Sequence, residues 1–186
     1  MSGLDHAIAF IVQTLAQLYL LLLLLRFWLP WLRADFRNPV AQGILKFTSP
    51  VVIPLRRFVP SIRRLDTATV LVAFIVQFVT LLVLFAILGR SLPHPVPIAI
   101  TAVIELVILS LNLFFFAILI RVILSWVAPH QYNPITALVA ALSEPVLRPF
   151  RRAIPAIGGI DISPVFAMIL IQALVIFLRS LRPVWA

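Results

Sequence analysis

The chain has 186 residues, of which 63% are hydrophobic and only 11% are charged. This proportion leaves too little polar surface to cover a water-soluble core, so the composition excludes a soluble globular protein and indicates a membrane protein. The absence of cysteine excludes disulfide bonds, thiolate metal ligands and a cysteine nucleophile. The formal net charge of +9 suits anionic partners, and we favour lipid head groups over nucleic acid because basic residues of membrane proteins gather on cytoplasmic loops.

Four apolar runs are long enough to cross a bilayer as helices, which takes about 20 residues each. We expect spans at about residues 7–32, 69–89, 97–127 and 164–182. No basic segment precedes the first run, so we interpret it as a retained anchor and not as a cleaved signal. The predicted fold class is all-α, integral to the membrane, with four transmembrane helices.

An internal repeat relates the two halves of the chain. An offset of 95 residues carries "SPVVIPLRRFVP" onto "EPVLRPFRRAIP" and also matches Arg26 with Arg121. We therefore predict two tandem units, residues 1–95 and 96–186, each built on a helical hairpin. Because two spans return the chain to its starting side, the two units are expected to insert in the same orientation, as parallel repeats.

The distribution of basic residues predicts the orientation in the membrane. The two long loops that follow the first and third spans hold most of them: Arg33, Arg37, Lys46, Arg56, Arg57, Arg63, Arg64, Arg148, Arg151 and Arg152. Only Arg90, Arg179 and Arg182 lie near the opposite face. The positive-inside rule then places both long loops in the cytoplasm and both termini outside it.

Each long loop contains two sequences typical of helix starts, a capping residue followed by proline. These are Asn38-Pro39 and Ser49-Pro50 in the first loop, and Asn133-Pro134 and Glu144-Pro145 in the second. They delimit segments of about ten residues, roughly 15 Å as helices, which are too short to span. We expect short amphipathic helices at the membrane interface, bent by Pro54 and Pro149, whether they lie on it or dip into it.

The basic residues of these helices are the first candidate site. In the second loop Arg148, Arg151 and Arg152 are predicted to share one helical face, opposite Val146, Phe150 and Ala153. Together with Arg56 and Arg57 they either bind anionic lipid, at about 1 kcal/mol each, or form a docking surface for a protein partner.

Two arginines interrupt the apolar runs at equivalent places, Arg26 and Arg121. Arg26 is close enough to the loop to extend its charged group to the cytoplasmic interface, and we favour this interpretation over a functional buried charge. Asp66 and Asp161, at the starts of the second and fourth spans, are the predicted partners, Arg26 with Asp66 and Arg121 with Asp161.

Glu105 has no counterpart in the first half and is expected to pair with Arg179, the alternative being a cation or proton path. Gln77 and Gln172 occupy equivalent positions and are predicted to hydrogen-bond between helices. The histidines lack metal-ligand spacing, and no motif for nucleophilic or acid–base catalysis is present, so we expect neither a metal, nor a cofactor, nor an enzyme.

The segment "PFRRAIPAIGGIDISP", with "RVILSW" and "YNP" before it, resembles the signature of the YggT family of bacterial integral membrane proteins, related to the YlmG proteins of cyanobacteria and plastids. The resemblance covers essentially the whole chain, as a two-repeat form. The motif residues carried over, as structural or partner-contact candidates, are Pro149, Arg151, Arg152, Pro155, Gly158, Gly159, Asp161, Ser163 and Pro164. Ser163 and Pro164 are expected to cap the fourth span. The first repeat departs from the motif, with Arg63-Arg64 in place of the glycines and Ala68-Thr69 in place of the serine and proline.

The resemblance implies a bacterial integral membrane protein. We predict a multi-pass protein of the inner membrane, and the distribution of basic residues places both termini in the periplasm. The resemblance associates the family with osmotic tolerance and potassium homeostasis, with cell division or nucleoid distribution, and with assembly of plastid cytochrome complexes, without naming a reaction. We predict a non-enzymatic scaffold that contacts a membrane-protein partner, or further copies of itself, through its basic loops. The alternative is a small channel or transport modulator, and nucleic-acid binding is the least favoured class.

Overall fold

The computed structural model describes residues 3–32, 37–61, 66–127, 133–154 and 161–183. Within these ranges the chain forms helices and no strand: α1 (Gly3–Trp31), α2 (Pro39–Arg56), α3 (Thr67–Ile87), α4 (Pro95–Val127), α5 (Pro134–Ala153) and α6 (Ser163–Ser180). Four of these helices, α1, α3, α4 and α6, are long and apolar enough to cross a membrane. The all-α fold and the four predicted spans are therefore confirmed, with ends that differ by a few residues.

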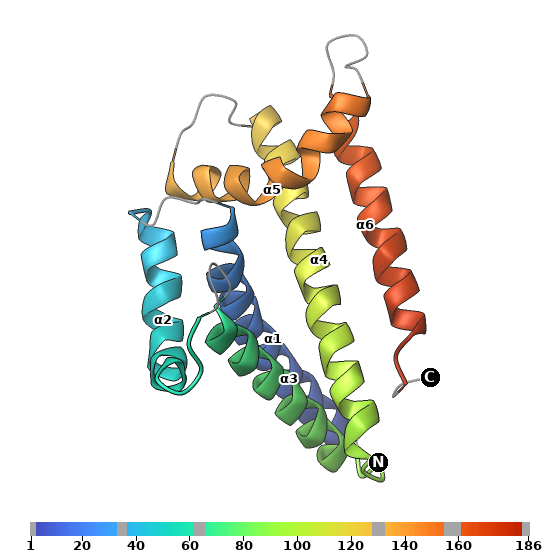
Figure 1. Ribbon diagram of the computed structural model, residues 1–186. Coiled ribbons are helices and arrows are strands. Elements are labelled where there is room, and N and C mark those ends of the chain that lie inside the picture. Colours follow the sequence, from blue (N-terminus) through green and yellow to red (C-terminus); the bar gives the residue numbers. More distant parts are fainter. Residues whose placement is uncertain (1–2, 33–36, 62–65, 128–132, 155–160, 184–186) are drawn as a thin grey trace.

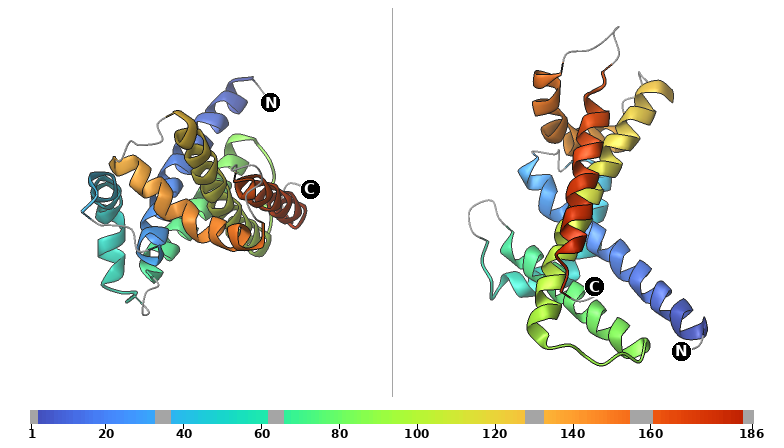
Figure 2. Two further views of the ribbon diagram at one scale, coloured as in Figure 1. Left: turned by 90° about the horizontal axis from the view of Figure 1, so that it is seen from above. Right: turned by 90° about the vertical axis from the view of Figure 1, so that its right-hand side faces the viewer.

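The spans form two hairpins, α1 with α3 and α4 with α6, and α3 packs against α4 where the hairpins meet (Figure 1). The order of neighbours through the bundle is thus α1, α3, α4, α6. In Figure 1, α1 and α4 both begin, and α3 and α6 both end, toward the lower end of the molecule. The two hairpins therefore run in the same direction, and the two further views show that they cross each other (Figure 2).

The end of α3 and the link that follows show how the hairpins are joined. Gly89 has a φ of 54°, a left-handed conformation that glycine adopts without a side-chain clash. The Arg90 backbone N–H then bonds to the Phe85 carbonyl at 3.1 Å, which satisfies a group left over at the helix end. Prolines follow in the link, so the chain cannot continue as a helix before α4 starts at Pro95.

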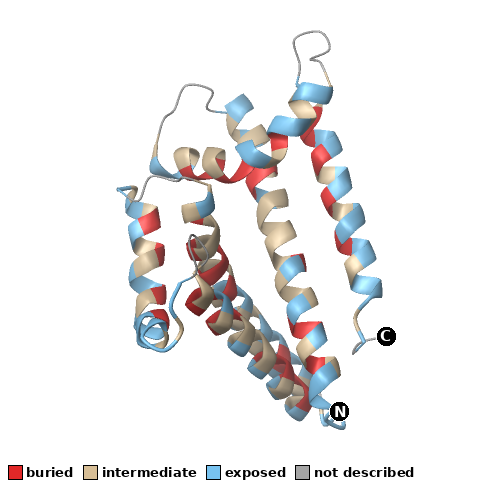
Figure 3. Cartoon of the chain, in the orientation of Figure 1, coloured by how far each residue is buried: buried red, intermediate tan, exposed pale blue. Residues whose placement is uncertain are grey.

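Buried apolar side chains hold each loop helix against its own hairpin. One cluster joins Leu20 and Leu23 of α1 with Val52 of α2 and Val72 of α3. The equivalent cluster in the second half centres on Leu147 of α5 and includes apolar side chains of α4 and α6. Figure 3 shows the buried positions as stripes on the inner faces of the helices. The outer faces of the spans stay exposed, as expected where lipid is the solvent.

A third cluster ties the two halves together near the loop helices. It contains Leu29 of α1, Ala41 and Ile44 of α2, Ala117 of α4 and Leu142 of α5. The Asn38 side chain also donates to the Pro134 carbonyl at 2.6 Å, so α2 and α5 meet where each begins. The two loop helices are therefore one connected layer and not two independent arms.

In the described part of each loop the chain forms one long helix and not the two short ones predicted. Asn38 and Asn133 do cap helix starts, since each side chain accepts backbone N–H groups of the following turn. The second pair of signals is not a start, because α2 continues through Pro50 and α5 through Pro145. Proline removes one backbone hydrogen bond and bends a helix. Both loop helices are bent in their second halves (Figure 1).

Candidate functional site: equivalent charge networks under the loop helices

Arg26 is buried inside the first hairpin, with 5% of its surface exposed. Its Nη1 donates to the Thr48 hydroxyl at 2.9 Å and to the Ser49 hydroxyl at 3.0 Å, both on α2. Its Nε lies 3.7 Å from Oδ2 of Asp66, at the start of α3. A single guanidinium from α1 thus contacts the loop helix and the returning span at once.

Asp66 is the other centre of this network. It caps α3 by accepting the Thr69 backbone N–H at 3.3 Å and the Thr69 hydroxyl at 2.7 Å. Its Oδ2 also pairs with Arg56, from the end of α2. Burial alone would raise the pKa of Asp66, but the hydrogen bonds from Thr69 and Arg56 outweigh it and hold the pKa below its usual value. The carboxylate therefore stays charged in its partly buried position.

The second hairpin carries a network of the same kind around Arg121. Arg121 Nη1 donates to the Ser143 hydroxyl at 3.0 Å and to Glu144 Oε2 at 2.7 Å, both on α5. Arg151 Nη1 reaches the same Glu144 oxygen at 3.0 Å, and its Nε bonds to Asp161 Oδ2 at 2.8 Å. The charges alternate along α4, α5 and the start of α6, so each arginine lies between acceptors.

The two networks occupy equivalent positions under the 95-residue offset. The pairs are Arg26 and Arg121, Thr48 and Ser143, Ser49 and Glu144, Arg56 and Arg151, and Asp66 and Asp161. Their chemistry differs at one pair, where a hydroxyl in the first half becomes a carboxylate in the second. Their burial differs as well, because the Arg121 side chain is 28% exposed against 5% for Arg26. The first network is buried at Arg26 and Asp66, with Arg56 exposed at its edge, whereas the second network is partly exposed throughout its ion pairs.

The acidic groups of the second network are held in the charged form. Hydrogen bonding from Arg121 is the main reason that the pKa of Glu144 is lowered. Burial would raise the pKa of Asp161, yet the hydrogen bonds from Arg151 and Ser163 lower it. Burial likewise works against the charge of Arg151, but Asp161 and Glu144 raise the pKa of its guanidinium.

These contacts correct two of the predictions for the arginines within the spans. The Arg26 side chain does not extend into solvent, because it is buried against α2, which supplies hydroxyl acceptors in place of water. Its predicted partner Asp66 is the right one. The predicted pairing of Arg121 with Asp161 is wrong, since Arg121 bonds to Glu144 and Asp161 bonds to Arg151.

The five arginines predicted to contact lipid or a partner fall into two groups. Arg56 and Arg151 are turned toward the aspartates and hold the loop helices in place. Arg57, Arg148 and Arg152 are exposed and have no ion pair within the described residues. The single basic face predicted for the second loop is therefore wrong, because Arg151 pairs with Glu144 and Asp161 while Arg148 and Arg152 do not.

The apolar face predicted opposite these arginines is partly confirmed. Val146 and Phe150 pack against the core of the second hairpin. Ala153, which was assigned to the same face, is exposed. Ala153 is the last residue of α5, where the helix ends.

The remaining polar predictions have mixed outcomes. Glu105 pairs with Arg182, at 2.6 Å, and not with Arg179, because the chain beyond α6 turns back toward α4. Gln77 and Gln172 are half-buried, and neither forms a hydrogen bond with another described residue, so the predicted bonds between helices are wrong. No group of three potential metal ligands occurs among the described residues.

The predictions for the motif residues also have mixed outcomes. Pro149 lies within α5, exposed, and Pro164 is buried in the first turn of α6. Ser163 is not the cap of α6; Asp161 accepts the Ser163 backbone N–H at 3.0 Å, and the buried Ser163 hydroxyl has no partner in the described structure. Pro155, Gly158 and Gly159 lie outside the described residues, as do Arg33, Arg63 and Arg64 of the basic loops.

Sequence reasoning missed the acceptors on the loop helices: Thr48, Ser49, Ser143 and Glu144. The repeat offset held the signal, because it aligns the hydroxyl of Thr48 with that of Ser143 next to the aligned arginines. Hydroxyl side chains on the inner face of an amphipathic helix are common, so only their recurrence at the same place in both halves distinguishes them.

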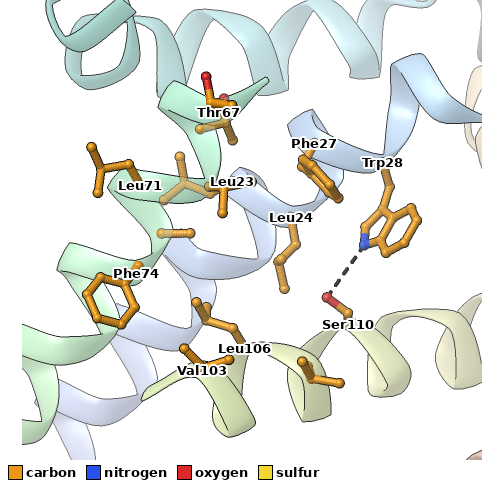
Figure 4. A pocket seen from close by; sticks show the side chains of 14 residues that line it. Leu23, Leu24, Phe27, Trp28, Thr67, Leu71, Phe74, Val103, Leu106 and Ser110 are labelled. Atoms are coloured by element: carbon orange, nitrogen blue, oxygen red, sulfur yellow. Dashed lines mark hydrogen bonds between the residues drawn. The ribbon is translucent and has the colours of Figure 1, made fainter. Parts of the chain in front are cut away.

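An apolar pocket of about 500 Å³ lies beside the first network, between the two hairpins. Side chains of α1, α3 and α4 surround it, and Trp28 Nε1 approaches the Ser110 hydroxyl at 3.5 Å at its edge (Figure 4). The Trp28 ring also makes an edge contact with Phe114 of α4, with centroids 4.9 Å apart. The pocket offers no acid, base or nucleophile apart from hydroxyl groups.

The structure therefore defines a helical membrane protein in which two hairpins of the same direction each hold a basic loop helix through buried or half-buried ion pairs. The model of the CCB3/YggT family matches residues 6–87 and 100–182, one segment in each half. The chain belongs to the CCB3/YggT family.

Relatives of similar length support this assignment. The chain is 44% identical to an uncharacterized protein of Pseudomonas aeruginosa over 173 residues, which cover 92% of this chain and 88% of that protein. It is 36% identical to the uncharacterized protein YggT of Escherichia coli over 170 residues, 91% of this chain and 87% of the relative. An uncharacterized protein of Haemophilus influenzae is 32% identical over 173 residues, 93% and 92% of the two chains. No solved structure matches.

Proposed function

We propose that the protein is a non-enzymatic scaffold of the bacterial inner membrane, which presents the loop helices α2 and α5 as one basic surface to a membrane-protein partner. The long loops lie in the cytoplasm and the termini in the periplasm. The exposed Arg57, Arg148 and Arg152 contact the partner or the anionic lipid beside it. The buried part of each network holds this surface rigid.

One observation carries the proposal: Arg56 and Arg151 of the loop helices form ion pairs with Asp66 and Asp161, next to the starts of spans α3 and α6. A loop that served only to set topology or to bind lipid needs no fixed geometry, because both effects depend on charge and not on shape. Ordering long arginine side chains costs conformational entropy, and a docking surface is a use that requires such order. The contact of α2 with α5 extends the ordered surface across both halves.

The transport alternative has less support from the geometry. Glu105, the carboxylate that suggested a cation path, has its charge balanced by Arg182. The pocket between the hairpins is lined almost wholly by apolar side chains, which disfavours a hydrated ion. We therefore treat ion transport as the outcome to examine if the scaffold test fails.

The test is photocrosslinking in native membranes from equivalent exposed positions. A photoreactive residue is placed at Arg57 in one variant and at Arg152 in another, which are related by the repeat offset. Position Val79, exposed on the membrane-spanning part of α3, is the matched control. We expect one protein to be captured from both loop positions, but not from Val79. Capture from the Arg57 position should be lost when Arg148 and Arg152 become glutamate in a chain that still inserts.

Capture of lipid alone from both loop positions would contradict the scaffold and reduce the arginines to anchoring. Capture of this chain's own copy alone would also contradict a scaffold for another protein. Either result would lead to ion-flux measurements on Glu105→Gln in reconstituted vesicles.

A further inference from the structure

The order of the spans leaves two helix faces without a protein neighbour. Within the described chain, α3 lies between α1 and α4, and α4 lies between α3 and α6. Among the described spans, α6 contacts α4, whereas α1 contacts α3 and also touches α4 through its second half, at Trp28 and Leu29. The repeat makes this asymmetry informative, because α6 is the equivalent of α3 and α1 is the equivalent of α4.

On α3, the face toward α4 is formed by Phe74, Phe78, Leu81 and Leu82, which pack around buried Ile98 and Ala102. The offset carries these four positions onto α6, as Ile169, Ala173, Ile176 and Phe177. Leu81 is 3% exposed, whereas its equivalent Ile176 is 67% exposed. The same surface is thus covered in the first repeat and uncovered in the second.

On α4, the face that covers α3 includes Ile98, Ala102 and Leu106. Their equivalents on α1 are Gly3, Ala7 and Ile11, and all three are exposed. The face they share is opposite the one that α1 buries against its own hairpin. The first helix of the chain therefore presents outward the surface that its repeat uses to join the two halves.

The two pockets differ in the same way as the helix faces, since the first is covered by a span and the second is not. The pocket of about 500 Å³ in the first half is covered by Val103, Leu106 and Val107 of α4. A pocket of about 620 Å³ beside Arg121 uses several equivalent positions, among them Val122 and Met168 in place of Phe27 and Ala73. No span of the described chain covers this second pocket as α4 covers the first. The equivalents of the covering residues are Ile8, Ile11 and Val12 of α1.

We propose that the exposed face of α6 binds the exposed face of α1 from a second copy of this chain, in the way that α3 binds α4 within one copy. The occupant is a second copy because this chain carries the matching half of the interface on its own first helix. Both copies keep the same orientation in the membrane, since α6 and α1 run in opposite directions as α3 and α4 do (Figure 1).

The contact joins different surfaces on the two copies, so it is heterologous, and a pair of copies retains one unpaired face at each end. Such an assembly closes into a ring or continues as a row. Small side chains favour close helix packing in membranes, and Ala7 and Ala173 lie on the two faces. The proposal does not depend on the scaffold function, because it concerns the membrane-spanning faces and not the loops.

Cysteine crosslinking tests the contact directly, because the chain has no cysteine of its own. Two copies with different tags are expressed together as full-length chains, one with Ala7→Cys and the other with Ile176→Cys. These positions are equivalent to Ala102 and Leu81, which share a buried cluster. A single chain with Leu81→Cys and Ala102→Cys is the positive control for reactivity. Ala7→Cys with Leu174→Cys is the negative control, since Val79, the equivalent of Leu174, stays exposed in the first repeat.

We expect membranes that contain Ala7→Cys and Ile176→Cys to give a crosslinked dimer with both tags, and the Leu174→Cys pair to give none. A chain with both Ala7→Cys and Ile176→Cys should form a ladder beyond the dimer. The proposal is overturned if the positive control closes and the tagged dimer is absent. It is also overturned if Leu174→Cys crosslinks as well as Ile176→Cys, or if each single cysteine crosslinks only to itself.

Discussion

Replacing Arg26 with methionine should destabilise the protein much more than the equivalent replacement of Arg121. Arg26 is 5% exposed and shares its site with the Asp66 side chain, which is 12% exposed. Removing one partner of a buried ion pair costs about 3–5 kcal/mol, because the other charge is left without its partner. Arg56 still pairs with Asp66 in the variant, so we expect the lower limit, about 3 kcal/mol.

The matched variant is Arg121→Met. Its pair with Glu144 is far more exposed, at 28% and 48% of the two side chains, and exposed pairs contribute about 0–1 kcal/mol. For a chain of this size, each 1 kcal/mol shifts the melting temperature by roughly 2–4 °C. We therefore expect a loss of about 6–12 °C for Arg26→Met and less than about 4 °C for Arg121→Met.

The assay is thermal unfolding of the purified protein in detergent micelles, followed by tryptophan fluorescence. The double variant Arg26→Met, Asp66→Asn should lose less stability than the sum of its two single changes, because the two side chains share one buried site. Equal losses from the two single arginine variants would refute the argument from burial. So would a double variant that loses the sum of its two single changes.

Two further predictions concern the other ion pairs. The folded-state pKa values of Glu144 and Asp161 lie below their usual values, so the stabilisation by these groups is complete above about pH 4 and is lost as the pH falls through the folded-state pKa. The melting temperature of Glu144→Gln should therefore fall less between about pH 5 and pH 3 than that of the unaltered protein. Parallel curves of melting temperature against pH for the two proteins would count against this prediction. Arg182→Met should destabilise the protein by about 1–2 kcal/mol, because the charged hydrogen bond to Glu105 is lost. Arg179→Met should change stability by less than about 0.5 kcal/mol. If thermal unfolding ranked the two variants in the opposite order, the pairing of Glu105 with Arg179 expected from sequence would be restored.

The spans were predictable because their signal is local. A run of about 20 apolar residues has one stable state in a bilayer, whatever the rest of the chain does. The repeat offset, a property of the whole sequence, then matched Arg26 with Arg121 before any contact was known. Asp66 could be assigned to Arg26 because it stands at the start of the returning span.

The errors share a physical origin, which is that a partner can come from a segment whose path the sequence does not reveal. Arg26 was expected to extend toward water because helix arithmetic measures its distance from the interface and ignores α2, which covers it. Arg182 was missed for the same reason, since it lies beyond the end of α6. In α2 and α5, Pro50 and Pro145 have the same local sequence signature whether a helix starts or bends there. Packing against the hairpins continues the helix at both.

The joining of three helices at one arginine limits how each hairpin can move. Arg26 contacts α2 through two hydroxyls and the start of α3 through Asp66, so these elements cannot separate without leaving a charge unpaired in a region that water does not reach. A displacement of α2 is therefore transmitted to the end of α1 and the start of α3. In the second half, Glu144 and solvent access provide alternative partners while α5 shifts. Force applied to the loop layer would accordingly be resisted by the first hairpin and accommodated by the second.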